Sequence, residues 1–217
     1  MVQINGIVNE YIHVEKPDQE AAPSLQFDIS KIDFDLLSRE FAHTRRKNLL
    51  LRDLDELVNQ QLAKMLFANP QRIDYYDRYQ EIIDAYNAEQ NRATIEKTFM
   101  DLMELASSLD TEQQRYVREG FSSDEELSVY DLLFSENLTK QEIETIKKVS
   151  VDLLTKIKQQ IAKLDHWTDK QETKAIVDNL IRNTLWQELP NSYDVSDIQT
   201  YQKKIYEYVY MRYPEVA

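Results

Sequence analysis

Apolar residues recur at spacings of three and four along most of the chain, which is the pattern of a helix with one buried face. The first long helix is predicted from about Asp33 to Ala68. Asn69-Pro70 ends it, because the residue before a proline avoids the helical region. A second helix is predicted over 71–87 and a third around 95–109.

Short polar signals divide the second half of the chain into further helices. Gly120 is predicted to end a short helix from about residue 111 as a left-handed cap. A Ser or Thr followed three residues later by Glu or Gln is typical of a helix start. Such pairs occur at Ser122/Glu125, Ser123/Glu126, Thr139/Glu142, Thr168/Gln171 and Ser196/Gln199. The pattern therefore predicts an all-α, multi-helix, bundle-like fold.

The first thirty residues follow a different pattern. Short alternating or β-branched runs, separated by Pro17 and Pro23, predict an irregular arm over 1–30 with room for one or two short strands. No linker-like composition and no repeat of fixed period follows the arm. Residues 31–217 are therefore predicted to form a single helical domain.

Composition excludes several classes of protein. The 217 residues include two glycines and no cysteine, and 26 basic against 39 acidic residues give a net charge of −13. Two glycines cannot build a P-loop or a Rossmann fingerprint, and the lack of cysteine excludes disulfides and Cys-based zinc sites. The acidic balance argues against a general nucleic-acid surface. No apolar run is long enough for a membrane span and no signal peptide is visible, so we expect a cytoplasmic protein without a membrane partner.

Two Glu-x-x-His spacings resemble those of di-iron bundles. Glu10 and His13 lie in the predicted arm, where residues three apart do not share a face. Glu40 and His43 lie in a predicted helix, but the basic run 45–47 follows at once and indicates solvent. We interpret both pairs as surface polar residues.

Two other constellations are compatible with nucleic-acid cleavage. Pro17-Asp18 with Glu172-x-Lys174 has the residue types of a Mg²⁺ nuclease, but such sites lie on adjacent strands and this lysine lies in a predicted helix. Arg39 and His43 can share a helix face, as histidine-based RNA cleavage requires, yet no polar residue supports them. We therefore predict no catalytic residue, no metal ligand and no cofactor-binding residue.

Two concentrations of side chains remain as candidates for binding. The basic one, able to contact DNA phosphate or an acidic partner, comprises Arg39, Arg45, Arg46, Lys47 and Arg52. The alternative is a solvated helix face that pairs with nearby carboxylates. The chain has 13 tyrosines, and the cluster near its end comprises Tyr201, Tyr206, Tyr208, Tyr210 and Tyr213. Positions 206, 208 and 210 of a helix cannot all face one core, so the cluster is a candidate partner interface, with packing inside the chain as the alternative.

Four stretches together resemble a known family. Residues 65–87 (MLFANPQRIDYYDRYQEIIDAYN) join Asn-Pro-x-Arg to a tyrosine-rich helix. They are accompanied by 32–41 (IDFDLLSREF), 119–134 (EGFSSDEELSVYDLLF) and 188–194 (ELPNSYD). Over about residues 27–217 the chain resembles the C-terminal region of the R (restriction and motor) subunits of type I restriction-modification enzymes.

The resemblance implies a role without chemistry of its own. In that family a nuclease domain and two helicase-like ATPase lobes precede the helical region, so ATP and Mg²⁺ are expected only in the parent subunit, an ATP-dependent translocase and site-specific deoxyribonuclease. None of the family's catalytic residues has a matching position here. The region would dock the R subunit onto the methyltransferase core of modification and specificity subunits, and would pack against the motor lobes. The alternative is an auxiliary DNA contact through 39–52 that guides duplex to the motor.

Overall fold

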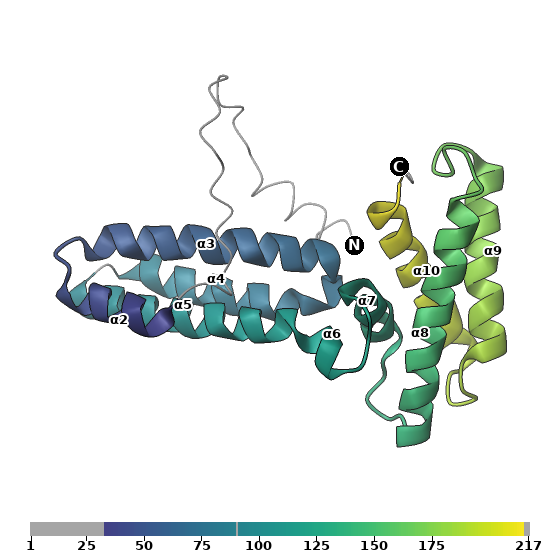
Figure 1. Ribbon diagram of the computed structural model, residues 1–217, viewed down its shortest axis with the longest axis horizontal. Helices are drawn as coiled ribbons and strands as arrows, with labels where there is room; N and C mark the ends of the chain where they lie inside the picture. The colour runs from purple at the N-terminus through teal and green to yellow at the C-terminus, as the bar shows by residue number, and fades with distance from the viewer. Residues whose placement is uncertain (1–32, 90, 215–217) are drawn as a thin grey trace. The chain divides into compact units, whose positions relative to one another are not determined.

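The computed structural model describes residues 33–89 and 91–214 (Figure 1). Every regular element in these two ranges is a helix, so the all-α prediction is confirmed. The predicted arm over 1–30 lies outside the described residues. Within the described part of the chain, no helix is long and apolar enough to cross a membrane.

The described residues form two compact units, each with its own buried core. Of the residues that the structure describes, unit 1 contains those up to Phe67 and those within Ile73–Glu112, and unit 2 contains Ala68–Arg72 and those from Gln113 onward. The single helical domain over 31–217 stays a prediction. The structure adds that its apolar interior is divided between two clusters.

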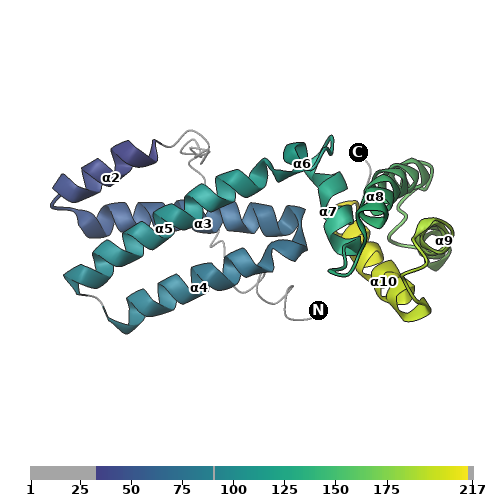
Figure 2. The same cartoon turned by 90° about the horizontal axis from the view of Figure 1, so that it is seen from below.

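The described part of unit 1 contains four helices whose apolar stripes converge. These are α2 (Phe34–His43), α3 (Lys47–Ala68), α4 (Ile73–Ala88) and α5 (Arg92–Gln113). Figure 2 shows α4 and α5 running in opposite directions. Val58 and Leu62 of α3 are buried with Phe99 and Leu102 of α5, as their three- and four-residue spacing predicts.

The predicted unbroken helix over 33–68 is wrong, because the chain leaves the helical conformation at Thr44. Thr44 has φ −74° and ψ 147°, and its Oγ1 accepts a hydrogen bond from the Arg46 backbone N–H at 3.1 Å. Such a local side-chain bond competes with the helix, which periodicity alone does not reveal. The break follows Phe41, which stacks on Phe99 with ring centroids 3.6 Å apart.

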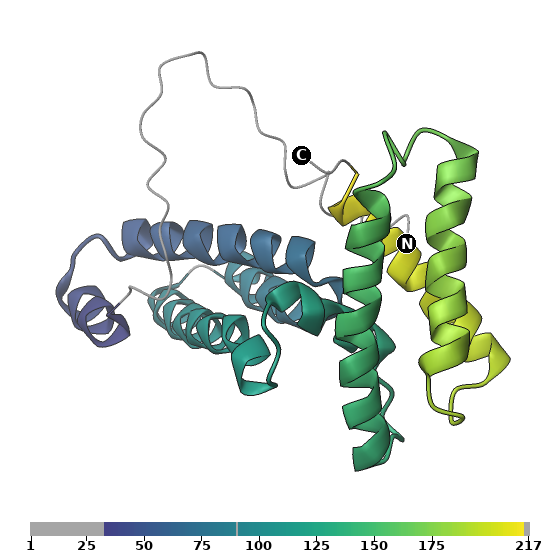
Figure 3. The same ribbon diagram turned by 45° about the vertical axis from the view of Figure 1, so that its right-hand side comes forward.

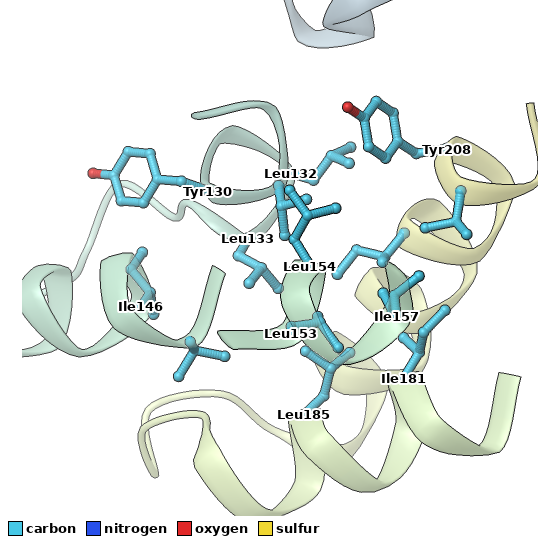
Figure 4. Packing of buried hydrophobic residues seen from close by; sticks show 14 of the residues in the cluster. Tyr130, Leu132, Leu133, Ile146, Leu153, Leu154, Ile157, Ile181, Leu185 and Tyr208 are labelled. Atoms are coloured by element: carbon cyan, nitrogen blue, oxygen red, sulfur yellow. The ribbon is translucent and has the colours of Figure 1, made fainter. Parts of the chain in front are cut away.

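In unit 2 the helices α7, α8, α9 and α10 each pack against two of the others. Its elements are the 3₁₀ turn η2 (Pro70–Arg72), α6 (Arg115–Arg118), α7 (Asp124–Leu133), α8 (Lys140–Ile161), α9 (Gln171–Glu188) and α10 (Val195–Arg212). Helix α8 packs against α7 and α9, and α10 packs against α9 and α7 (Figure 3). In Figure 4, Leu153 and Ile157 of α8 lie near Ile181 and Leu185 of α9, all four fully buried.

The left-handed cap predicted at Gly120 is confirmed, at the end of α6. Gly120 has φ +83°, a region that costs an L-residue strain. Its N–H bonds the Val117 carbonyl at 3.1 Å, and the Phe121 N–H bonds the Tyr116 carbonyl at 2.8 Å. This pair of bonds is a Schellman motif.

Two of the predicted helix starts are confirmed. Thr139 and Glu142 form a capping box at the start of α8. At α7, Ser123 accepts a hydrogen bond from the Glu126 N–H at 3.3 Å, so the second of the two overlapping serine signals is the one used.

Two other predicted starts are wrong by two residues. Helix α9 is preceded by Lys170, which makes no side-chain cap, so Thr168 is not its N-cap. Helix α10 is capped by Asp194, whose side chain forms a capping box with Asp197, so Ser196 already lies in the first turn. A carboxylate accepts from backbone N–H groups as well as a hydroxyl does, and here the carboxylate comes first.

Candidate functional site

The five C-terminal tyrosines lie on or just after α10, and most of their ring surface packs within unit 2. Tyr208 is 3% exposed, and Tyr201, Tyr206 and Tyr213 are half-buried against the core. Tyr210 is the most exposed, at 39%. The predicted partner interface stays a prediction, and the structure shows that four of the five rings also serve the core.

Trp167 packs against two of these rings, Tyr206 and Tyr210. It lies in the connection between α8 and α9, is 1% exposed, and donates from Nε1 to the Tyr213 carbonyl at 2.6 Å. Tyr206 and Tyr210 stack on each other and meet the indole edge-on, with centroids 6.2 and 5.7 Å from it. Edge-to-face packing of this kind stabilises a core beyond its buried area.

Glu125 links α7 to both α8 and α10. It accepts a short hydrogen bond from Lys158, and Arg212 lies 3.9 Å away. Burial raises the pKa of Glu125, but the hydrogen bond and charge of Lys158, together with Tyr213 and Arg212, outweigh burial, so the pKa is lowered. Burial also raises the pKa of the neighbouring Tyr208 and Tyr213, which keeps both phenols neutral.

Two members of the predicted basic cluster are engaged within unit 1. Lys47 Nζ lies 2.7 Å from a Glu96 carboxylate oxygen. Arg52 pairs with its neighbour Asp53 at 3.5 Å, where both side chains are exposed. For these two residues the structure favours the alternative, a helix face that pairs with nearby carboxylates, over a contact with DNA or an acidic partner.

The other three members are exposed near the break between α2 and α3. Arg39 lies on α2, and Arg45 and Arg46 lie in the break itself. None of the three makes an ion pair with a residue that the structure describes. They remain available to an anion, and their contact with DNA or an acidic partner stays a prediction.

Unit 2 contains a network of polar side chains that was not predicted from the sequence. It includes the Asn and Arg of the Asn-Pro-x-Arg motif. Arg72, 3% exposed, forms two parallel hydrogen bonds to Asp124, at 3.0 and 2.6 Å. Asn69 is fully buried and donates to Asp131 at 2.6 Å, while its Oδ1 accepts from the Gln71 N–H. The motif thus holds its own segment against α7, a structural role.

Two further side chains complete the network. Arg115 also bonds Asp131, and Ser128 Oγ lies 2.9 Å from the Ala68 carbonyl. The sequence signal for this network is the Asn and Arg of the motif, which lie on either side of Pro70. Their partners could not be predicted, because they lie 62 and 52 positions further along the chain, respectively.

The described members of the spacings weighed as metal or nuclease sites lie on α2 and α9. Glu40 and His43 lie on α2, and Glu172 and Lys174 lie on α9. Among residues 33–89 and 91–214, no group of three or more His, Asp or Glu side chains is placed to hold a metal ion. The earlier members of these spacings, at 10, 13, 17 and 18, lie outside the described residues.

Helix α9 carries a large exposed side chain that was not predicted from the sequence. Trp186 is 50% exposed, and Ile176 on the same helix is 42% exposed. The periodicity of α9 contained the signal, because Val177, Ile181 and Leu185 define the buried face and leave these two positions off it.

These helices and the comparison with known families define the class of protein. The family match places the chain among the C-terminal regions of type I restriction enzyme endonuclease subunits. Residues 17–213 match the family described as "Type I restriction enzyme HindI endonuclease subunit-like, C-terminal", and the chain belongs to that family. Neither the curated proteins nor the solved structures gave a match.

Proposed function

We propose that this chain is a non-catalytic docking domain that attaches the endonuclease subunit to the methyltransferase core of modification and specificity subunits. The observation that carries the proposal is the contrast between the two tryptophans. Trp167 is 1% exposed in the core of unit 2, whereas Trp186 is 50% exposed on α9. Tryptophan is enriched among the residues that dominate protein interfaces, and family membership supplies a multi-subunit setting.

The proposal extends to the rest of the parent subunit. The motor lobes of the parent subunit would be a second partner of this domain, and ATP and Mg²⁺ would be used in those lobes. A stable interface buries about 800 Å² on each partner. Trp186 would therefore be the centre of a larger patch.

Co-elution tests the proposal directly. The purified chain is mixed at micromolar concentration with the purified modification–specificity complex and resolved by size-exclusion chromatography. We expect the chain to shift into the earlier peak of the complex. A chain that keeps its helical circular dichroism and still elutes alone would contradict the proposal.

A second candidate function, DNA binding, is favoured by three exposed arginines on α2 and in the break between α2 and α3. Arg39, Arg45 and Arg46 make no ion pair with any described residue and would suit DNA phosphates. Fluorescence anisotropy with a labelled duplex at 50 and 200 mM salt tests this, because phosphate contacts are strongest at low salt. Binding at 50 mM that weakens on Arg45→Glu supports the candidate, and no binding at 50 mM excludes it.

A further inference from the structure

One side of α9 differs in composition from the exposed side of α8, the helix that packs beside it. Its exposed residues recur at three- and four-residue spacings, so they share one side of the helix. We call the part of this side that follows the first turn of the helix the α9 outer face; it comprises Ala175, Ile176, Asn179, Arg182, Asn183, Trp186 and Gln187. Only one of these seven is charged; the other exposed residues of α9 are Gln171 and Glu172, in the first turn.

Helix α8, which packs beside α9, provides an internal comparison. Beyond its own first turn, the exposed residues of α8 are Glu144, Lys148, Asp152, Thr155, Lys158 and Gln159. Four of these six are charged and none is apolar. The exposed side of α8 is thus mostly charged. The α9 outer face instead has the composition of an interface core, which is poor in charge and carries aromatic and arginine side chains.

The single charge on this face has no carboxylate partner. Arg182 Nη2 donates to the neutral Asn179 Oδ1 at 2.7 Å, one turn earlier on the same helix. Among the described residues Arg182 forms no ion pair, although the chain contains 39 acidic residues. The bond to Asn179 orients the guanidinium and leaves most of its donors open, and a carboxylate is the acceptor that fits them best.

We propose that the α9 outer face binds another protein, one that presents an apolar pocket for the Trp186 indole and a carboxylate beside it for Arg182. The inference rests on the proposed docking function and names the surface and the chemistry of the partner's site. In this arrangement Trp186 supplies buried apolar area, Arg182 fixes the register, and Asn179 and Asn183 bond polar groups at the rim.

Two other occupants fit this face less well. Nucleic acid would require several basic residues, and the face has one. A second copy of this chain bound across a twofold axis at this face would bring the two Arg182 side chains together. Each copy also carries a net charge of −13, so self-association is opposed by repulsion.

Single substitutions on the full chain test the inference. Binding of the purified modification–specificity complex is measured by calorimetry for wild type, Trp186→Ala and Arg182→Glu. We expect about 30-fold weaker binding for Trp186→Ala, the loss typical of a hot-spot residue, and about tenfold or more for Arg182→Glu. Both side chains are exposed, so the helical circular dichroism and the thermal midpoint of each variant should match wild type.

Two variants serve as matched controls. Lys148→Glu reverses an exposed charge on α8, and Met100→Ala removes a large side chain that is 56% exposed on α5 of unit 1. We expect both to bind within about twofold of wild type. Trp186→Phe should keep part of the affinity, because it retains an aromatic ring for the pocket.

The outcomes separate the inference from the function on which it rests. If the wild-type chain binds and both α9 variants bind equally well, the face is not the interface, and the docking function stands. If the folded wild-type chain does not bind the complex at all, the docking function fails and the inference fails with it. Losses that are as large for Lys148→Glu as for Arg182→Glu would also overturn the assignment, because they would indicate general electrostatics.

Discussion

The buried Arg72–Asp124 pair provides the sharpest test of how unit 2 is held together. We consider Arg72→Met, which keeps an unbranched apolar stem but removes the guanidinium. The substitution breaks both hydrogen bonds to Asp124, at 3.0 and 2.6 Å, and leaves the carboxylate without its cation. We expect it to destabilise unit 2.

The magnitude follows from how buried each partner is. Removing one partner of a fully buried ion pair costs about 3–5 kcal/mol, because the remaining charge is stranded away from water. Arg72 is 3% exposed, but the Asp124 side chain is 30% exposed, so water can solvate the carboxylate in part. We therefore expect a loss of about 2–3 kcal/mol in the free energy of unfolding.

Urea unfolding followed by circular dichroism measures this loss. Asp124→Asn in the Arg72→Met background removes the stranded charge, so the double variant should recover part of the stability. Arg45→Met is the matched control, because it removes an exposed guanidinium and should change stability by less than about 0.5 kcal/mol. An Arg72→Met chain as stable as Arg45→Met would refute the assignment of this pair as a buried anchor.

Three further changes test other parts of the account. Tyr79→Phe removes the 2.7 Å hydrogen bond to Asp55, and should cost about 1.5–2 kcal/mol in urea unfolding at neutral pH. Because burial raises the pKa of Asp55, this cost should shrink when acid protonates the carboxyl, and an equal cost at every pH would contradict the pairing. The pKa of Glu125 in the folded chain lies below its usual value, so Glu125→Gln should cost stability at neutral pH, and this cost should be lost as pH falls through the folded-state pKa. Urea titrations from pH 7 to pH 3 should therefore converge for Glu125→Gln and wild type, and parallel curves would refute the Lys158 link. Gly120→Ala should cost about 1 kcal/mol in thermal unfolding, because φ is +83° while nothing lies within 4 Å of the added methyl group, and an unchanged midpoint would contradict the left-handed cap.

Helices could be predicted from the sequence wherever one local rule decided the outcome. The apolar spacing of α8 and the Thr139 cap agree, and the structure places a helix start there. The rule failed where two local options competed. At Thr44 a side-chain hydrogen bond ended a helix that the apolar pattern would have continued, and at α10 Asp194 capped the chain before Ser196 could.

The candidate site was less predictable because its contacts are distant along the chain. The tyrosines near the end of the chain could not be divided between core and surface until Trp167 was placed beside Tyr206 and Tyr210. The burial of Arg72 and its pairing with Asp124 could not be predicted, because the two residues are 52 positions apart in the sequence. The α9 outer face emerged only when its buried side was known, because its exposed residues are ordinary one by one.

Competition in the assembled enzyme tests the central claim, that this domain docks the endonuclease subunit, most directly. The purified chain is added in increasing excess to the modification–specificity complex before the full-length endonuclease subunit, and ATP-dependent DNA cleavage and DNA methylation are then both measured. We expect wild-type chain to occupy the docking site, so that cleavage falls while methylation is unchanged, and Trp186→Ala chain to compete about 30-fold less well. Cleavage that persists undiminished under a large excess of folded wild-type chain would contradict the claim.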